Sequence, residues 1–306
     1  MTKRAALQSA FLVDGADLSG DIGALGTIEI TRTLQDVTGL DKSGTERIAL
    51  RSDGQMAYDG FWNTDAGASV PVLRELPDTN VIATYLSGRS VGDWGASLVG
   101  KKTNFNVTRG QDGSIGLSGV VMGGAGSRLE WGRLLTLGAQ AFGATQAIDE
   151  WTADTAYAED DLVVPTTPNG HYYQATVAGT SDDTTEPTWP TNGTTVVDDG
   201  VTWQDMGLLP NGIDRGVGSA SDFGLAVYVH ILSIGAGSVT VTIEDSGDRV
   251  AWAPVIATAA PLTTAGAVRL QTDVDENVRR YVRAVLTGTF TDLVAAVVVV
   301  PYRTQQ

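Results

Sequence analysis

The residues best suited to ligand chemistry gather between Asp149 and Met206. Six aromatic side chains in this stretch can stack on the C–H face of a sugar ring, because the negative face of an aromatic ring favours that contact. They are Trp151, Tyr157, Tyr172, Tyr173, Trp189 and Trp203. So short a stretch does not need six aromatic rings for its core, which predicts an open platform. We expect Tyr172, Tyr173, Trp189 and Trp203 to form this platform, although Trp151 and Trp203 are equally suited to the core and all six can be structural.

Groups for catalysis or metal binding are scarce in the sequence. There is no cysteine, which excludes thiolate catalysis and cysteine-based zinc sites. Of the two histidines, His230 lies in an apolar strand-like run, where a structural role is favoured. His171 follows Asn-Gly and is interpreted as a loop residue, and no G-x-S-x-G motif accompanies either histidine. We therefore expect no catalytic residue, no metal site and no cofactor.

Negative charge is concentrated in the same stretch. The net charge of the chain is −16, and no Lys or Arg occurs between Arg133 and Arg215, where 13 acidic residues lie. A composition shift this sharp predicts an inserted domain over residues 148–208, between an N-terminal module of residues 1–147 and a C-terminal module of residues 209–306. An acidic balance disfavours nucleic-acid binding and instead repels DNA that passes close by.

The N-terminal module is predicted to be rich in strands. Residues 27–34 alternate apolar and polar side chains, and residues 81–86 form a further apolar run. Asp-Gly pairs favour two-residue hairpin turns, so Asp53-Gly54 and Asp112-Gly113 predict two hairpins. One short helix is expected over residues 127–141, because Ser127 and Glu130 have the spacing of a capping box.

The C-terminal module is predicted to be a compact antiparallel sandwich or barrel. Its expected strands are residues 223–233, 239–243, 250–256, 267–271, 280–286 and 293–302. The apolar run at residues 293–300 is far shorter than the ~20 residues that span a bilayer, so no membrane partner is expected. The fold class is thus mainly β: two β-sandwich or barrel modules with one short helix, plus a small inserted β domain.

The insert resembles the chitin-binding-type carbohydrate modules found on glycosidases and phage proteins. The matching pieces are Ala156-Tyr157, Asp161-Leu-Val163, Tyr173-Gln-Ala175, Pro187 and Trp203. The insert departs from the family pattern where Asp160 replaces a glycine. This resemblance implies a polysaccharide as a possible partner of the aromatic platform.

The flanking modules resemble the major tail proteins of long-tailed actinobacterial phages. The matching pieces include Leu40-Asp-Lys-Ser-Gly-Thr-Glu-Arg47, Asp53-Gly54, Phe61-Trp62, Lys102-x-Asn104, Glu130-Trp-Gly132, Gly212-Ile-Asp214, Gly224-Leu-Ala-Val-Tyr228 and Arg280-Tyr-Val-Arg283. The family joins its two halves directly, whereas this chain carries the insert at their junction.

The second resemblance implies a structural protein of the virion, made in the host cytoplasm, and no enzyme. Copies would form a homo-oligomeric ring, a trimer or a hexamer. Rings would stack into a tail tube that contacts other tail proteins and lets DNA pass without specific binding. The insert is expected to project outward. A capsid decoration protein or a baseplate adhesin that binds host-surface sugar remains an alternative, as does a glycosidase, which would need two carboxyl groups about 5–10 Å apart.

Overall fold

The computed structural model describes residues 8–124, 128–139, 149–167, 169, 171–208, 212–216, 224–249, 251–273 and 275–301. Strands dominate, which confirms the mainly β fold class, and the one helix of the described residues is the short α1 (Ser69–Leu73). No helix in these ranges has the length and apolar character to cross a membrane.

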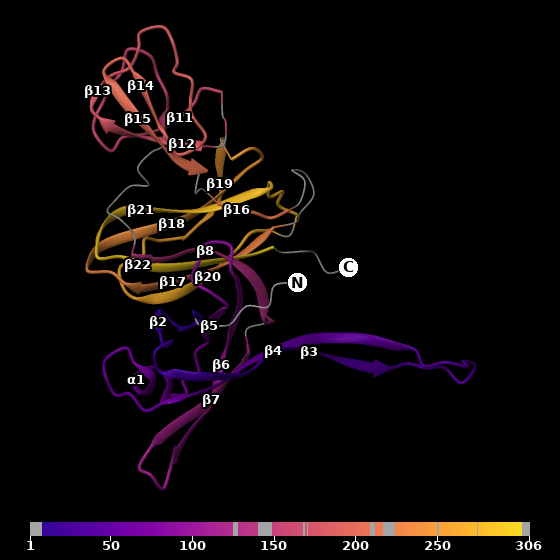
Figure 1. Ribbon diagram of the computed structural model, residues 1–306. Coiled ribbons are helices and arrows are strands. Elements are labelled where there is room, and N and C mark those ends of the chain that lie inside the picture. Colours follow the sequence, from indigo (N-terminus) through magenta and orange to yellow (C-terminus); the bar gives the residue numbers. More distant parts are fainter. Residues whose placement is uncertain are drawn as a thin grey trace.

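An 11-stranded sheet runs through both flanking modules. Its main path follows the order β2-β1-β5-β6-β8-β22-β17-β20, and β3, β4 and β7 branch from it (Figure 1). Its strands are β1 (Ala10–Val13), β2 (Ala16–Asp17), β3 (Ile22–Asp36), β4 (Arg47–Phe61), β5 (Val81–Leu86), β6 (Trp94–Arg109), β7 (Ile115–Gly123), β8 (Glu130–Ala139), β17 (Leu225–Ser233), β20 (Gly266–Gln271) and β22 (Val294–Pro301). Because β8 pairs with β22, strands of the two flanking modules belong to one continuous sheet.

A smaller antiparallel sheet completes the C-terminal sandwich. It contains β16 (Ile213–Asp214), β18 (Ala236–Ser246), β19 (Trp252–Ala257) and β21 (Tyr281–Thr291), in the order β16-β21-β18-β19. Inward side chains of β17 and β22, such as Val227 and Val297, pack against Val241 of β18 and Val282 of β21. Alternating Val and Ile residues produce this two-sheet core because successive side chains of a strand point to opposite faces.

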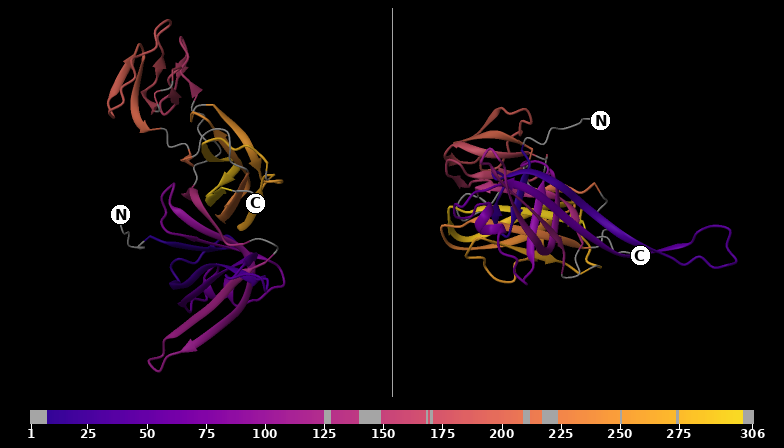
Figure 2. Two further views of the ribbon diagram at one scale, coloured as in Figure 1. Left: turned by 90° about the vertical axis from the view of Figure 1, so that its right-hand side faces the viewer. Right: turned by 90° about the horizontal axis from the view of Figure 1, so that it is seen from below.

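Residues 149–208 form sheets of their own. The strands are β9 (Asp149–Glu150), β10 (Ala156–Tyr157), β11 (Leu162–Val164), β12 (His171–Val177), β13 (Gly179–Thr180), β14 (Thr195–Asp198) and β15 (Val201–Leu208). They make a five-stranded sheet, β14-β15-β12-β11-β9, and the pair β10-β13. Figures 1 and 2 show this segment as a separate body, at the opposite end of the molecule from the β6–β7 hairpin.

The short helix predicted over residues 127–141 is wrong. Residues 130–139 form β8, while Ser127 and Ala141 lie outside the described residues. β8 lies between β6 and β22, where Gly95 pairs with Gly132 and Leu134 pairs with Val298. A Cβ at Gly132 would come within 2.3 Å of the Val299 carbonyl oxygen, so the close approach of β22 requires glycine there. Tertiary pairing therefore overrides a local capping signal.

Of the two predicted Asp-Gly turns, only one is a turn. At Asp112-Gly113 the hairpin is confirmed, with Arg109 of β6 opposite Ile115 of β7 and Gly113 at a φ of 87°. Asp53-Gly54 is wrong as a turn, because both residues lie inside β4. A Cβ on Gly54 would meet the Leu129 Cβ at 2.5 Å, so this glycine permits close packing instead of a reversal.

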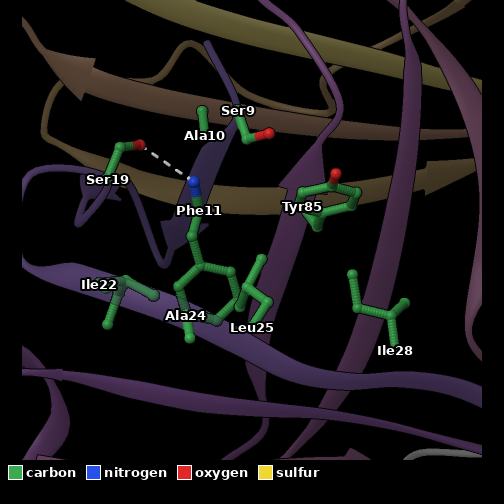
Figure 3. Close-up of a pocket in the computed structure, with 10 residues that line it drawn as sticks. Ser9, Ala10, Phe11, Ser19, Ile22, Ala24, Leu25, Ile28 and Tyr85 are labelled. Carbon is green, nitrogen blue, oxygen red and sulfur yellow. Dashed lines mark hydrogen bonds between the residues drawn. The ribbon is translucent and has the colours of Figure 1, made fainter. Parts of the chain in front are cut away.

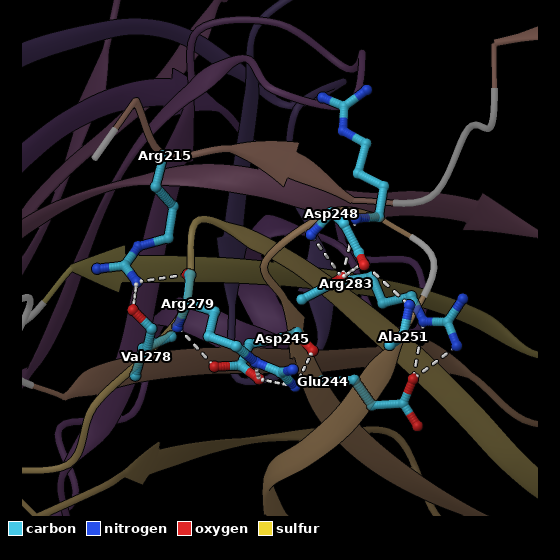
Figure 4. Close-up of polar contacts among 10 residues, drawn as sticks. Arg215, Glu244, Asp245, Asp248, Ala251, Val278, Arg279 and Arg283 are labelled. Atoms are coloured by element: carbon cyan, nitrogen blue, oxygen red, sulfur yellow. Dashed lines mark hydrogen bonds and ion pairs between the residues drawn. The ribbon is translucent and has the colours of Figure 1, made fainter. Parts of the chain in front are cut away.

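Ion pairs reinforce the end of the smaller sheet (Figure 4). Asp245 of β18 is buried and accepts hydrogen bonds from the Arg279 backbone N–H at 2.6 Å and from its Nε at 2.7 Å. Beside it, Arg283 Nε donates to Glu244 Oε2 at 2.8 Å. A buried carboxylate is stable in such a place only when its oxygens are well paired. These residues therefore fix the register of β18 against β21.

His230 is a buried structural residue where the two flanks meet. Gly15 N–H donates to its Nδ1 at 3.4 Å, so its Nε2 carries the proton and donates to Thr84 Oγ1 at 2.9 Å. Thr84 in turn shares a hydrogen bond of 2.9 Å with Ser97. The histidine ring thereby joins β17 to β5 and to the turn after β1. Burial lowers the pKa of His230 to about 3.

This histidine makes the protein less stable in acid. The unfolded chain takes up a proton near pH 6.5 while the folded chain stays neutral down to about pH 3. The contribution of this group to stability is therefore fully present above pH 6.5 and is lost as the pH drops toward 3, by on the order of 5 kcal/mol. Urea unfolding at pH 7 and pH 4 should show a smaller pH-dependent loss in His230→Gln than in the wild type. Equal losses in the two proteins would contradict this assignment.

Candidate assembly site

A long two-stranded ribbon leaves the body of the molecule. β4 pairs with β7 only from Gln55 to Phe61, so its earlier residues pair with β3 alone. We call residues 30–54 the arm; its base packs beside Leu129 and β7, and Figures 1 and 2 show its outer part reaching far from every other element. Its loop spans residues 37–46 and is closed by a 2.9 Å hydrogen bond from the Val37 N–H to the Glu46 carbonyl.

The arm carries apolar side chains that nothing covers. Ile28 of β3 lies opposite the buried Met56, so this side of the strand faces the N-terminal core. Because side chains alternate along a strand, Ile30 and Leu34 continue the same side. They are 46% and 55% exposed. Val37 and the fully exposed Leu40 add two apolar side chains at the tip. The side of β3 that faces the N-terminal core thus continues along the arm, where its side chains are exposed to solvent.

The arm is also electrically distinct from the rest of the chain. It holds four basic residues and four acidic residues, and so has no net charge. They are Arg32, Lys42, Arg47 and Arg51, and Asp36, Asp41, Glu46 and Asp53. The net charge of −16 therefore belongs to the remainder of the molecule. A neutral arm can approach another copy without the repulsion that two acidic bodies experience.

The β6–β7 hairpin repeats this design on a smaller scale. Val107 of β6 lies opposite the buried Leu117, and Ile115 follows on the same side of β7. Both Val107 and Ile115 are exposed, and so is Trp62. The backbone N–H of Trp62 donates to the Ile115 carbonyl oxygen at 3.3 Å. A second projecting ribbon therefore presents its apolar side to solvent.

A groove lined mostly by apolar side chains, with some polar groups among them, opens at the base of the arm (Figure 3). Its volume is about 450 Å³, and its wall is made by β1, β5 and the first half of β3. The lining residues are Ser9, Ala10, Phe11, Ser19, Ile22, Gly23, Ala24, Leu25, Ile28 and Tyr85. None of them is charged. Phe11 is held in place by a 3.0 Å hydrogen bond from its N–H to Ser19 Oγ. The groove thus adjoins the N-terminal core, and its exposed lining combines polar and apolar atoms.

The open aromatic platform predicted in the insert is wrong for two of its four members. Tyr173 and Trp203 are fully buried. Tyr173 lies on the inward side of β12, and its ring lies 4.3 Å from that of Trp189 between centroids. Trp203 makes an edge contact with Tyr157 at 4.9 Å. Packing between the strands covers these ring faces, so they belong to the core of the insert.

The other predicted site residues are placed as follows. Trp151 and Tyr157 are buried in the same core, Trp189 is partly buried against it, and Tyr172 is half-buried on the opposite side of β12. The insert therefore uses most of its aromatic residues to build itself. His171 also differs from its predicted loop position, since it begins β12, and its Nδ1 lies 2.8 Å from Asp205 Oδ1.

The core of the insert is organised by one carboxylate. Asp198 is only 3% exposed, and its Oδ2 accepts hydrogen bonds from Trp151 Nε1 at 2.8 Å and Trp203 Nε1 at 2.9 Å. Its Oδ1 accepts the Asp182 backbone N–H at 3.0 Å. Sequence reasoning missed this role because Asp198 stands next to Asp199 in a turn, and adjacent acids there are typical of solvated residues. Across the part of the chain that the structure describes, no group of three His, Asp or Glu side chains is placed to hold a metal ion.

The sequence is matched by no protein-family model and by no curated protein. Among solved structures, the chain is similar to the Dit protein of phage SPP1, described as a hub of the adsorption apparatus in phages infecting Gram-positive bacteria. The identity is 10% and the TM-score 0.27, over 96% of this chain and 99% of that one. It is also similar to the phage p2 baseplate in its activated conformation.

For the form of that baseplate with strontium, the identity is 10% and the TM-score 0.27, over 97% of this chain and 99% of that one. For the form with calcium, the identity is 11% and the TM-score 0.27, over 98% of this chain and 99% of that one. A TM-score this low does not establish a common fold, so neither likeness carries weight for function.

Proposed function

We propose that this protein is a structural subunit of a phage tail, which assembles with copies of itself into stacked rings that form a tube for DNA. The arm is the observation that carries this proposal. A two-stranded ribbon is at best marginally stable in water, and contiguous exposed apolar residues usually mark a contact site. The arm has both properties, so its design suits a partner that covers it.

Because both flanks resemble major tail proteins, we infer that this partner is another copy of the same chain. The arm includes one of the matching pieces, Leu40-Asp-Lys-Ser-Gly-Thr-Glu-Arg47. Pairing or covering ribbons between copies also protects strand edges that would otherwise drive uncontrolled association. The acidic body suits a lumen along which DNA moves without being bound.

We place residues 148–208 on the outside of the assembly as a separable domain. Every ladder recorded for the described strands of this segment joins them to one another. The segment also lies at the opposite end of the molecule from the β6–β7 hairpin (Figure 1). A body in that position leaves both hairpins accessible to neighbouring copies. No catalytic role is assigned to it.

Electron microscopy of the purified protein at high concentration tests the proposal. We expect rings that stack into hollow tubes, and we expect the same from a chain that lacks residues 149–207. Particles that remain monomeric at every concentration would overturn the proposal. Single rings that never stack would favour a baseplate or decoration role instead.

A further inference from the structure

We propose that the groove at the base of the arm receives the tip of the arm, residues 34–48, of a second copy. This inference rests on the proposed function, because it names the surface through which the subunits join. Among the residues that the structure describes, two features are open to solvent in the single copy: a projecting tip with exposed apolar side chains, and an uncharged groove lined mostly by apolar side chains. The apolar side chains of the tip and of the groove can cover one another.

The tip cannot fill the groove of its own chain. Leu25 and Ile28 line the groove and belong to β3, the strand that continues into the arm. A strand rises about 3.3 Å per residue, so the end of β3 at Asp36 lies roughly 26 Å beyond Ile28. Folding the tip back would break the β3–β4 ladder, which continues to Asp36 and Arg47. A tip that enters this groove must therefore come from another copy.

The sizes of the two features agree. A cavity of about 150 Å³ holds a benzene-sized group, so a groove of about 450 Å³ has room for roughly three apolar side chains. The tip offers four exposed apolar side chains, so the groove has room for most of them; they are Leu34, Val37, Leu40 and Ile48. Their transfer into the groove removes apolar surface from water on both molecules, which is the main source of favourable free energy in association.

Charge also favours this occupant. The groove lining contains no charged residue, so an inserted side chain meets no ion that must lose its water. Three charged residues beside the tip already have partners within the arm. Lys42 Nζ lies 3.3 Å from Glu46 Oε1, and Asp36 Oδ1 accepts the Thr38 N–H at 2.9 Å and its hydroxyl at 2.6 Å. The tip can thus approach the groove with these three side chains already partnered.

The contact would join two different surfaces. One copy contributes the tip of its arm, and the other contributes its groove. Head-to-tail contacts of this kind generate a ring when the rotation closes, and a filament when it does not. In a ring or a filament, each copy has two neighbours through this contact. In a dimer with twofold symmetry, each arm would enter the groove of the other copy, and each copy would have one neighbour.

Cysteine pairs test the contact directly, because the natural chain has no cysteine. Leu40→Cys labels the tip, and Ala24→Cys labels the groove at an exposed position. The two single variants are mixed under air, and disulfide-linked dimers are measured on non-reducing gels. We expect a dimer band in the mixture that is at least tenfold stronger than in either variant alone. A disulfide requires Cα atoms within about 7 Å, so the band reports a specific contact.

The matched control pairs Leu40→Cys with Val197→Cys, an equally accessible position on the insert. This pair should give no more dimer than the single variants. If the tip and groove cysteines link no better than the control pair, the inference is overturned, whether or not tubes form. If they link in a protein that never forms rings or tubes, the groove contact stands and the proposed tail role falls.

Discussion

Replacing Ile30 and Leu34 together with Asp is expected to prevent assembly while the folded body remains intact. Both side chains lie on the core-facing side of the arm and are about half exposed in the single copy. Covering the exposed half of each one is worth about 1 kcal/mol, and each unpaired carboxylate that the contact would bury adds a larger cost of several kcal/mol. The double variant should therefore weaken each contact by at least about 3 kcal/mol, which is more than a hundredfold in affinity.

Light scattering after size exclusion, together with electron microscopy, measures this effect. The variant should elute as a monomer at concentrations where the wild type forms rings or tubes, and its melting temperature should stay within a few degrees of the wild type. Val177 and Val197 provide a matched control, since they are also about half exposed or more but lie on the insert. Their double replacement with Asp should leave assembly unchanged. Normal assembly of the arm variant would show that the arm is not the contact.

A second large effect is expected in the insert, where Asp198→Ala should unfold residues 149–208. The substitution leaves three buried N–H groups without an acceptor: those of Trp151, Trp203 and Asp182. Each unsatisfied buried donor costs about 1–3 kcal/mol. The total approaches the whole stability of a unit of about 60 residues, which is roughly 3–9 kcal/mol. The flanking sheets should remain folded because they share no ladder with the described strands of the insert.

Limited proteolysis with mass spectrometry distinguishes the two parts of the chain. New cleavage sites should appear within residues 149–208 of Asp198→Ala and nowhere in the flanks. The control is Asp183→Ala, which removes an exposed carboxylate of the same insert and should be cleaved like the wild type. Cleavage of both variants to the same extent would show that Asp198 does not organise the core.

Much of the strand pattern could be predicted because it depends on local periodicity. Residues 81–86 and 239–243 alternate or run apolar, and they lie in β5 and β18. Predictions failed where a distant part of the chain decides the outcome. Gly54 resembles a turn glycine, but its role is to admit Leu129 from a segment that the sequence does not reveal as a neighbour. The capping pattern at Glu130 predicted a helix for the same reason, whereas residues from Glu130 onward form β8, which pairs with β6 and β22.

The candidate site was harder to predict than the fold. Aromatic residues in the insert indicated chemistry, but the sequence could not tell which faces packing would cover, and Tyr173 and Trp203 proved to be core. The groove could not be foreseen at all, because β1, β3 and β5 form it together. One signal was present in the sequence. Val37 and Leu40 are the two apolar residues in the loop of residues 37–46, and an interface between copies would explain both.

The position of β22 between β8 and β17 determines when, during synthesis, the main sheet can fold. Leu134 and Val298 are partners in the ladder but are separated by about 160 residues, so their pairing requires the closure of a very long loop. While the ribosome is still making the residues before 294, the main sheet lacks a central strand and β8 has an open edge. Nascent chains therefore cannot complete this sheet, and folding of the two flanks into one body must follow synthesis of β22.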